Sequence, residues 1–484
     1  MQMNETARSA NMPEGWLATT EEGVCRQRGK LLFVAPSAYP LGGLATWLDY
    51  LVPGLRDKGW KVTIGLTAGQ FHNVDAYQKI HPFDKIVEIG NLTGSREGRI
   101  RNLCRAMQAL RPDIVAGVNI PDTYAAVERL RSDKAKGPRV VMTIHGIQPD
   151  IYEDAGDYRS VLDAVICTNK LACRLVREEA ALEEKRIYYA PYGVELSDNH
   201  RQCSSGGPLR IAYSGRLDHF QKRVDDIPKI LLLLKHKGIP FEFIVAGGGP
   251  AEPALKEQLA FSGLSDVVRF LGVLSYTDLV EQVYRFADIL LVTSLWETGP
   301  IVIWEAMAYG IAVVTSSYIG SGMEGSLKNN ENCLLFPVGD IQTATECIEY
   351  LADPGVRRSI AKGGYRLVED RYSRERSVEE WDGCFRKILD APTKHPASQN
   401  RTFPPTGRLD RLFGNRIAED IRTLTGRRFT HTNPGGEWPH SYGMRQDNDA
   451  LFWKKAKSLD RCACQYAALR VKERFNKNHE GNTP

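Results

Sequence analysis

The sequence lacks the features of a membrane-spanning, secreted or metal-binding protein. No apolar run approaches the ~18 residues that cross a bilayer, and the longest, IPKILLLLK, is better explained as a buried helix. The first 28 residues are polar and rich in acidic residues, unlike a secretory signal. The ten cysteines are scattered, with no pair at Cys-x-x-Cys spacing. This excludes the common zinc and redox motifs and favours reduced thiols in a cytosolic protein.

Two further absences narrow the function. The dinucleotide-binding fingerprint G-x-G-x-x-G is absent, which argues against an oxidoreductase that uses NAD. The net charge is only +4, which is too small to make nucleic acid the expected partner. The charge is uneven, because residues 391–484 hold 17 Lys and Arg against 9 Asp and Glu. No cluster has metal-ligand spacing, so we expect no metal and no other cofactor.

Short apolar runs rich in β-formers alternate with longer helical patterns along most of the chain. The runs KLLFVAP, WKVTIGLT, PDIVAGVNI and RVVMTIHG are expected strands, and the pattern restarts at LRIAYSGRL after a polar break at residues 197–208. This alternation predicts parallel sheets with helices on both faces. We therefore expect an α/β protein with two doubly wound, Rossmann-like domains that face each other across a cleft. The expected parts are an extension at residues 1–28 and domains at residues 29–196 and 208–390.

Residues 391–484 fall outside the alternating pattern and form a basic C-terminal extension. Its first part, APTKHPASQNRTFPPTGR, is polar and rich in proline and is expected to be a linker. Residues 447–475 have apolar residues at helical spacing among many basic ones. This helix either packs on the body of the protein, which we favour, or contacts an anionic membrane or a partner.

Candidate binding residues follow the predicted strands, where ligands bind in doubly wound folds. Gly42 and Gly43 stand between the first strand and its helix. They either form a tight turn or let a phosphate or sugar approach the helix N-terminus. His145 ends an apolar strand, and we expect it to face the ligand crevice rather than to be structural. Arg216 and Lys222 flank a loop after a strand and suit a diphosphate, unless they are merely solvated.

The segment SLWETGPIVIWEAMAYG holds two carboxylates, Glu297 and Glu305, separated by seven residues. We expect Thr298 to cap the next helix and Pro300 to occupy its first turn. Glu297 then lies in a loop and Glu305 lies well inside the helix. Glu305 is placed to bond the hydroxyls of a ribose, and Glu297 those of a second ring. The backbone of residues 299–301, in which Gly299 and Ile301 carry N–H groups, lies between them and suits a phosphate, so the pattern predicts a nucleotide sugar.

From about Lys30 to about Tyr372 the chain resembles the retaining glycosyltransferases of family 4, which have the GT-B fold. The resemblance is carried by GGLATWLDYL, TIHG, YYAPYGVE, YSGRL…QKRVDD, AGGGP, RFLG and, most specifically, ETGPIVIWEAMAYGIAVVTSS…ENCLLFPVGD. Family members often have Phe-Gly after the first Glu, where this chain has Thr298-Gly299-Pro300, and Cys333 replaces a usual glycine. The loop YIGSGMEGS matches its usual Gly-Gly-x-x-Glu form only loosely. These departures bear on the donor sugar more than on the reaction.

The resemblance implies that the second domain holds most of the donor. The two cations would bind its diphosphate, Glu305 its ribose, and the backbone of residues 299–301 its phosphate or sugar. Glu297 would contact the transferred sugar, as a nucleophile or as an anchor for its hydroxyls, while His145 and Gly43 would approach the donor from the first domain. The expected catalytic residues are thus Glu297 and His145, and the expected substrate-binding residues are Gly42, Gly43, Arg216, Lys222, Gly299, Pro300, Ile301 and Glu305.

We therefore expect transfer of a hexose-type sugar from a nucleotide diphosphate sugar to an acceptor hydroxyl, with retention of configuration and without a metal. The family favours a carbohydrate or lipid-linked acceptor in polysaccharide or glycoconjugate synthesis, bound near residues 66–105. A nucleotide-sugar epimerase or a sugar phosphorylase of the same fold stays open, as does a non-catalytic scaffold with a binding tail. The expected location is the cytoplasm, and a peripheral contact with the inner membrane face through the C-terminal extension stays open.

Overall fold

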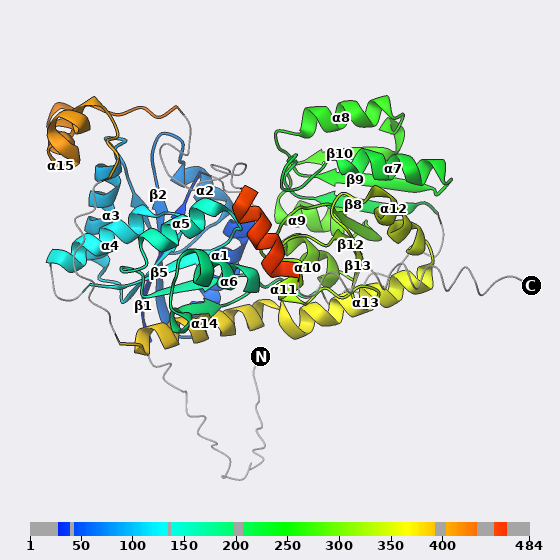
Figure 1. Cartoon of the computed structure of the whole chain (residues 1–484), viewed down its shortest axis with the longest axis horizontal. Coiled ribbons are helices and arrows are strands. Elements are labelled where there is room, and N and C mark those ends of the chain that lie inside the picture. Colours follow the sequence, from blue (N-terminus) through cyan, green and yellow to red (C-terminus); the bar gives the residue numbers. More distant parts are fainter. Residues whose placement is uncertain are drawn as a thin grey trace, which may run out of the picture.

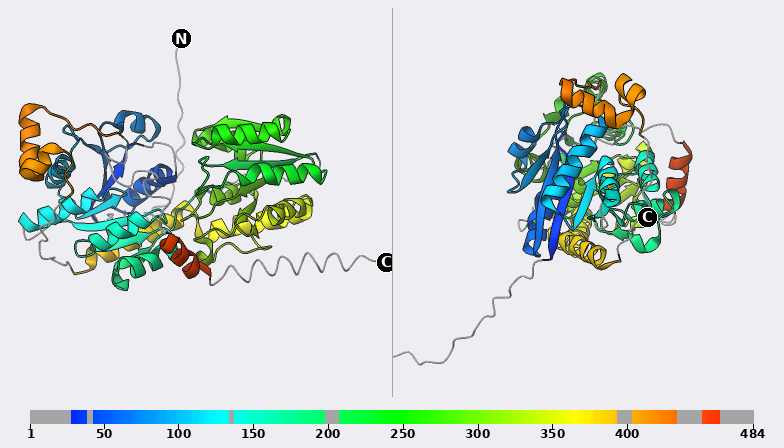
Figure 2. Two further views of the ribbon diagram at one scale, coloured as in Figure 1. Left: turned by 45° about the horizontal axis from the view of Figure 1, so that its top comes forward. Right: turned by 90° about the vertical axis from the view of Figure 1, so that its left-hand side faces the viewer.

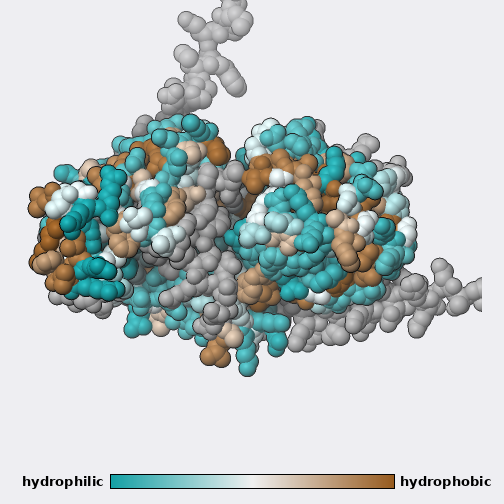
Figure 3. Space-filling model, turned by 90° about the horizontal axis from the view of Figure 1, so that it is seen from above, coloured by the Kyte–Doolittle hydropathy of each residue, from teal (hydrophilic) through white to brown (hydrophobic). Residues whose placement is uncertain are grey.

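Two parallel sheets with helices on both faces build two lobes, as the ribbon drawing of the computed structural model shows (Figure 1). The space-filling view from above also shows the two lobes (Figure 3). The structure describes residues 28–38, 43–133, 137–197, 207–392, 403–432 and 450–461. Within these ranges no helix combines the length and the apolar character needed to cross a membrane. The architecture confirms the predicted fold class.

The first sheet has seven parallel strands in the order β3-β2-β1-β4-β5-β6-β7. Most of its strand residues are buried, because helices cover both faces. Its strands are β1 (Gly29–Pro36), β2 (Trp60–Thr67), β3 (Ile86–Ile89), β4 (Ile114–Val118), β5 (Arg139–Ile144), β6 (Ala164–Cys167) and β7 (Ile187–Tyr189). Its helices are α1 (Gly43–Asp57), α2 (Val74–Ile80), α3 (Arg96–Leu110), α4 (Asp122–Asp133), α5 (Pro149–Asp157) and α6 (Lys170–Glu179), with a 3-10 turn at Glu184–Arg186.

The second sheet has six parallel strands in the order β10-β9-β8-β11-β12-β13. Its strands are β8 (Leu209–Ser214), β9 (Phe241–Ala246), β10 (Val268–Gly272), β11 (Ile289–Val292), β12 (Ala312–Ser316) and β13 (Leu334–Phe336). Its helices are α7 (Asp226–His236), α8 (Glu252–Phe261), α9 (Tyr276–Leu279), α10 (Ile301–Ala308), α11 (Ser321–Glu324), α12 (Ile341–Tyr350) and α13 (Pro354–Arg371), with a 3-10 turn at Ser265–Val267 and a π-helical turn at Val280–Tyr284.

Each sheet has one point at which the strand order reverses. In the first sheet this point lies between β1 and β4, and in the second between β8 and β11. Ligands of doubly wound sheets bind beyond the carboxyl ends of the strands at such points. The segments that leave β1, β8 and β11 carry Gly43, Arg216 and Glu297, so three of the predicted site residues follow switch-point strands.

The polypeptide crosses between the lobes twice, and this corrects the predicted domain boundary at residue 390. Helix α14 (Arg374–Asp390) packs on the first lobe rather than the second, with Trp381 and Phe385 in the core that α1 and β1 also build. The two crossings lie side by side, because the N–H of Val194 donates to the carbonyl of Tyr372 at 2.8 Å. The predicted linker at residues 197–208 falls largely outside the described residues.

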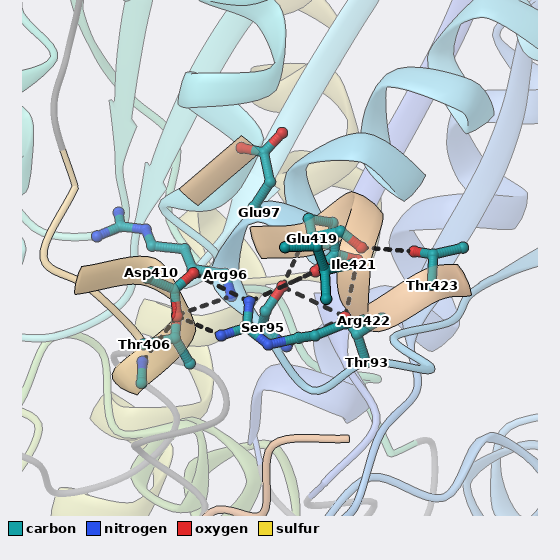
Figure 4. A network of polar contacts seen from close by, with 12 residues as sticks. Thr93, Ser95, Arg96, Glu97, Thr406, Asp410, Glu419, Ile421, Arg422 and Thr423 are labelled. Atoms are coloured by element: carbon teal, nitrogen blue, oxygen red, sulfur yellow. Dashed lines mark hydrogen bonds and ion pairs between the residues drawn. The ribbon is translucent and has the colours of Figure 1, made fainter. Parts of the chain in front are cut away.

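The C-terminal extension contains a helix that the sequence did not predict, α15 (Arg408–Thr425). It docks on α3 of the first lobe through Glu419, whose carboxylate accepts hydrogen bonds from Thr93 Oγ1 at 2.9 Å and Ser95 Oγ at 2.5 Å (Figure 4). Arg422 forms a buried ion pair with Asp410 within the same helix. Most of the predicted linker before it lies outside the described residues.

The helix predicted at residues 447–475 is described only at residues 450–461, and we call this part the tail helix. It packs on the body of the protein, with Phe452 and Ala456 buried in the same core as residues of the first lobe. Figures 1 and 2 both place it at the junction of the two lobes, drawn in red. Of the two alternatives for this helix, packing on the body of the protein is therefore the one that the structure shows for residues 450–461.

Candidate functional site

Two helix N-termini meet where the lobes touch. Helix α1 begins at Gly43 and α10 at Ile301. A Cβ atom added at Gly43 would lie 2.9 Å from Ile301 Cδ1, so the close approach of the two segments favours glycine there. Both helices therefore direct the positive ends of their dipoles toward one junction. Gly42, which we predicted beside Gly43, lies outside the described residues.

Glu297 forms an ion pair with Lys222. The Lys222 ammonium donates to Glu297 Oε1 at 2.5 Å, and Ser294 Oγ donates to the same oxygen at 2.6 Å. The Glu297 side chain is buried and the Lys222 side chain is only 19% exposed, so water screens this pair weakly. An anion and the hydroxyls of a ligand can both be held here, because the ammonium has three donors and the carboxylate two acceptor oxygens.

Arg216 lies on the same loop as Lys222. Its Nη2 donates to Gln221 Oε1 at 2.8 Å and lies 3.6 Å from Asp218 Oδ2. Gln221 Nε2 in turn donates to the carbonyl of Trp296 at 3.3 Å, next to Glu297. The structure thus joins the two predicted cations to the Glu297 segment through one loop.

The start of α10 corrects our prediction for Thr298. Its hydroxyl does not cap the helix but donates to the carbonyl of His145, in the first lobe, at 2.8 Å. Pro300 is the N-cap residue rather than the first helical residue, and among the described residues no side chain caps the helix. Gly299 has φ +132°, and a Cβ atom there would lie 3.0 Å from the ring of Tyr192. Glycine is favoured on both counts.

Glu305 lies in the second turn of α10 and is buried. Its Oε2 accepts a hydrogen bond from the Tyr284 hydroxyl at 2.6 Å. Burial raises the pKa of Glu305 to about 7, although the bond from Tyr284 and the charge of Arg374 oppose the shift. The carboxyl therefore changes its charge near neutral pH. Glu297 and Glu305 do not share a helix face, as the sequence predicted.

His145 follows β5 and sits among aromatic rings. Its ring centroid lies 4.6 Å from that of Trp47, and its plane stacks on Tyr192 at 5.6 Å. Its Nδ1 bonds the Tyr192 hydroxyl at 2.6 Å and its Nε2 bonds Thr143 Oγ1 at 2.9 Å. Burial lowers the pKa of His145 to about 3, so the ring is neutral at physiological pH. It can donate a hydrogen bond from one nitrogen but is a poor source of a proton.

Several residues of this site were not singled out from the sequence. Tyr284 bonds Glu305, Ser294 bonds Glu297, and Tyr192 bonds His145. Tyr284 and Tyr192 come from other elements than their partners, so no local spacing signalled them, whereas Ser294 lies three residues before Glu297 in the same segment. Tyr192 belongs to YYAPYG, a motif of the family resemblance from which no role for this tyrosine followed.

Glu324, in the loop YIGSGMEGS, ties the lobes together beside the site. Its Oε2 accepts from the backbone N–H of Lys170 at 3.1 Å, and its Oε1 accepts from Tyr189 at 2.5 Å and Tyr372 at 3.1 Å. Lys170 and Tyr189 belong to the first lobe, whereas Glu324 belongs to the second. Glu324 therefore makes a contact between the two domains. We assign it no contact with a ligand.

The site has no built metal centre in the part of the chain that the structure describes. No group of three or more His, Cys, Asp or Glu side chains there is placed to hold a metal ion. The arrangement instead combines a cation loop, a helix N-terminus and two buried carboxyls, which is chemistry for an anion joined to hydroxyl-bearing rings.

This chain spans about half of the length, or less, of the curated relatives that it matches by sequence. An uncharacterised glycosyltransferase of Methanocaldococcus jannaschii is 29% identical over 183 residues, which are 37% of this chain and 45% of the relative. A Campylobacter jejuni enzyme named as an α-1,4-N-acetyl-D-galactosaminyltransferase acting on an undecaprenol diphosphate-linked saccharide is 27% identical over 182 residues, 37% of this chain and 49% of that protein.

Solved structures agree with the fold. HepE of Anabaena, solved in complex with UDP and glucose, has a TM-score of 0.61 and 18% identity, covering 74% of this chain and 99% of HepE. The profile described as Glycosyltransferase Family 4 matches residues 41–198, and the profile described as Glycosyl transferases group 1 matches residues 198–367. Together the two profiles run through both lobes, and the chain belongs to this family of GT-B glycosyltransferases.

Proposed function

We propose that this protein transfers a sugar from a nucleotide diphosphate sugar to an acceptor hydroxyl with retention of anomeric configuration. The observation that carries the proposal is the segment from Glu297 to Glu305, in which the Lys222–Glu297 ion pair comes just before the N-terminus of α10 and buried Glu305 lies in its second turn. A sugar, a diphosphate and a ribose occur in the same order in the proposed donor. HepE, which shares the fold, was solved with UDP and glucose.

The cations and the helix dipole would stabilise the charge that grows on the leaving diphosphate. Lys222 is already pre-positioned against Glu297, and Arg216 is held by Gln221, so little reorganisation is needed when the charge develops. His145 would approach the donor from the first lobe as a neutral ring, and one of its bonds to Tyr192 and Thr143 would have to give way for it to donate to the donor. Glu297 would contact the transferred sugar, either as a nucleophile or as an anchor for its hydroxyls.

The acceptor would be a carbohydrate or a lipid-linked saccharide bound on the first lobe. The Campylobacter relative is named for a lipid-linked acceptor. On this lobe α15 packs on residues 93–101, within the region where we expected the acceptor. Its exposed apolar side chains include Leu412 and Leu424, which are 74% and 87% exposed. We propose that α15 rests on an anionic membrane surface that carries the acceptor.

Exposed arginines lie on the same helix and just after it, and they suit anionic lipid. They are Arg408, Arg411, Arg416, Arg427 and Arg428. The acids Asp410 and Glu419 of α15 are buried in contacts with the protein, and Asp420 is paired with Arg101. The outer face therefore carries positive charge beside apolar side chains, the combination that binds membrane interfaces. Figure 3 shows brown and teal side chains mixed at the left end of the molecule, where α15 lies.

A panel of UDP-, GDP- and ADP-sugars tests the donor class. We expect one nucleotide class to raise the melting temperature and to be turned over when saccharide acceptors are supplied. The coupling constant of the new anomeric proton reports retention. Conversion of the donor without an acceptor would instead indicate an epimerase, and a need for inorganic phosphate would indicate a phosphorylase.

Two substitutions test the assigned residues in that assay. Glu305→Ala and Arg216→Ala should each lower turnover by about 10²-fold or more, because each removes a group that stabilises the bound donor or its leaving charge. Matched controls are Glu331→Ala and Arg285→Ala, which remove exposed, ion-paired side chains from the same lobe. Near-normal turnover in both site variants, with the controls unchanged, would count against the proposal.

A further inference from the structure

The tail helix contacts both lobes beside the candidate site. On the first lobe, Phe452 packs on Tyr152 of α5 with ring centroids 5.5 Å apart. Lys455 Nζ lies 2.5 Å from Glu179 Oε1 of α6. These contacts fix the helix to the first lobe through one apolar and one charged contact.

On the second lobe, Trp453 packs between two segments that carry site residues. Its ring centroid lies 5.8 Å from that of Trp296, the residue before Glu297. It also lies 5.9 Å from the ring of Phe220, two residues before Lys222. One aromatic side chain therefore supports both the carboxylate segment and the cation loop.

Asp460 holds a third segment of the second lobe. Its Oδ2 accepts from the backbone N–H groups of Gly320 at 2.8 Å and Gly322 at 3.1 Å, and its Oδ1 accepts from that of Met323 at 2.8 Å. The approach is close, because a Cβ atom at Gly322 would lie 2.0 Å from the Asp460 carbonyl oxygen. Asp460 is buried, so these bonds are shielded from water.

The three supported segments are joined by their own backbone around Glu297. The N–H of Glu297 donates to the carbonyl of Ile319 at 3.1 Å, and the N–H of Leu295 donates to that of Gln221 at 2.7 Å. A Cβ atom at Gly320 would lie 2.2 Å from the Glu297 carbonyl oxygen. A shift of residues 319–323 or of Trp296 would therefore move Glu297.

We propose that Trp453 and Asp460 are positioning residues for the Lys222–Glu297 pair. They touch neither member of the pair directly but hold the segments on which both depend. The tail helix, which lies outside the two matched family profiles, would thus complete the sugar end of the site while it ties that site to the first lobe. The predicted effect on kcat rests on the proposed function. The predicted effect on the position of Glu297 does not.

Enzyme kinetics on full-length variants test the consequence. Trp453→Ala and Asp460→Ala should lower kcat by about tenfold or more, since small misplacements of reacting groups are costly. Affinity for the nucleoside diphosphate should fall less in Asp460→Ala than in Trp453→Ala, because Trp453 packs on the loop that carries Lys222, whereas Asp460 holds residues 320–323. Trp453→Phe should recover most of the activity, and Lys457→Ala, an exposed position on the same helix, should behave as wild type.

Hydrogen exchange on the same variants tests the structural claim without any activity. We expect faster exchange in peptides covering residues 216–223, 293–299 and 319–323, with the rest of both lobes unchanged. Wild-type kcat in both alanine variants, or faster exchange spread evenly over both lobes, would overturn the proposal. If the wild type transfers no sugar, the proposed function fails, while the exchange pattern still decides whether the tail helix holds Glu297.

Discussion

Glu305 is the residue whose chemistry depends most on burial. Its pKa is raised to about 7, so it is mostly neutral below that pH and ionised above it. An ionised carboxylate accepts stronger hydrogen bonds from the hydroxyls of a ribose than a neutral one. In our proposal, binding of the nucleotide therefore favours the ionised form and releases a proton.

Nucleotide affinity should for this reason rise with pH. Between about pH 6 and about pH 8 we expect affinity for the nucleoside diphosphate to increase by up to about tenfold, as Glu305 loses its proton. Titration calorimetry across this range measures the effect. Glu305→Gln should remove the pH dependence, apart from the ionisation of the phosphate itself, which both proteins share. An equally steep rise in the variant would show that Glu305 is not the titrating group.

Individual residues also show where local sequence rules stop. Thr298 precedes a helix and fits the rule for a capping residue, yet its hydroxyl bonds the carbonyl of His145 from the other lobe. The position of His145 at a strand end followed from the strand pattern. The strand pattern did not predict that His145 stacks on Trp47 and Tyr192, because these rings come from distant parts of the chain. Contacts between lobes leave no local spacing in the sequence.

At the scale of elements, most strands of the sheets and the tail helix were predictable, whereas α15 was not. Strands of the parallel sheets are short apolar runs, and each is followed by a helix, so β1, β5, β8 and β11 could be read directly. Helix α15 carries exposed apolar residues on one side and a buried Glu419 on the other, which weakens the usual helical pattern. Helix α15 is held on the first lobe by the hydrogen bonds that Thr93 and Ser95 donate to Glu419.

Helix α15 makes a test of membrane binding possible at this scale. The double variant Leu412→Ser and Leu424→Ser should lose most of its binding to vesicles that contain phosphatidylglycerol, because apolar insertion and charge act together. Co-sedimentation measures this, with phosphatidylcholine vesicles as the neutral comparison. Phe261→Ser is the matched control, since Phe261 is 95% exposed but lies on the second lobe. Wild-type binding by the double variant would contradict a role for α15.

At the scale of the whole molecule, the two lobes are connected in more ways than the sequence pattern suggests. Helix α14 returns to the first lobe, Glu324 reaches across from the second, and the tail helix touches both. The pattern predicts two doubly wound domains in series but not the return of α14 to the first lobe, because α14 has the same amphipathic pattern whichever lobe it covers. Relative movement of the lobes must therefore alter these contacts.

The central claim is that one junction between the lobes holds the nucleotide and the sugar of the donor. A crystal structure of the protein with its preferred nucleotide sugar tests this most directly. We expect the ribose against Glu305, the diphosphate at Arg216, Lys222 and the N-terminus of α10, and the sugar beside Glu297. A donor bound elsewhere, with these groups unoccupied, would contradict the account.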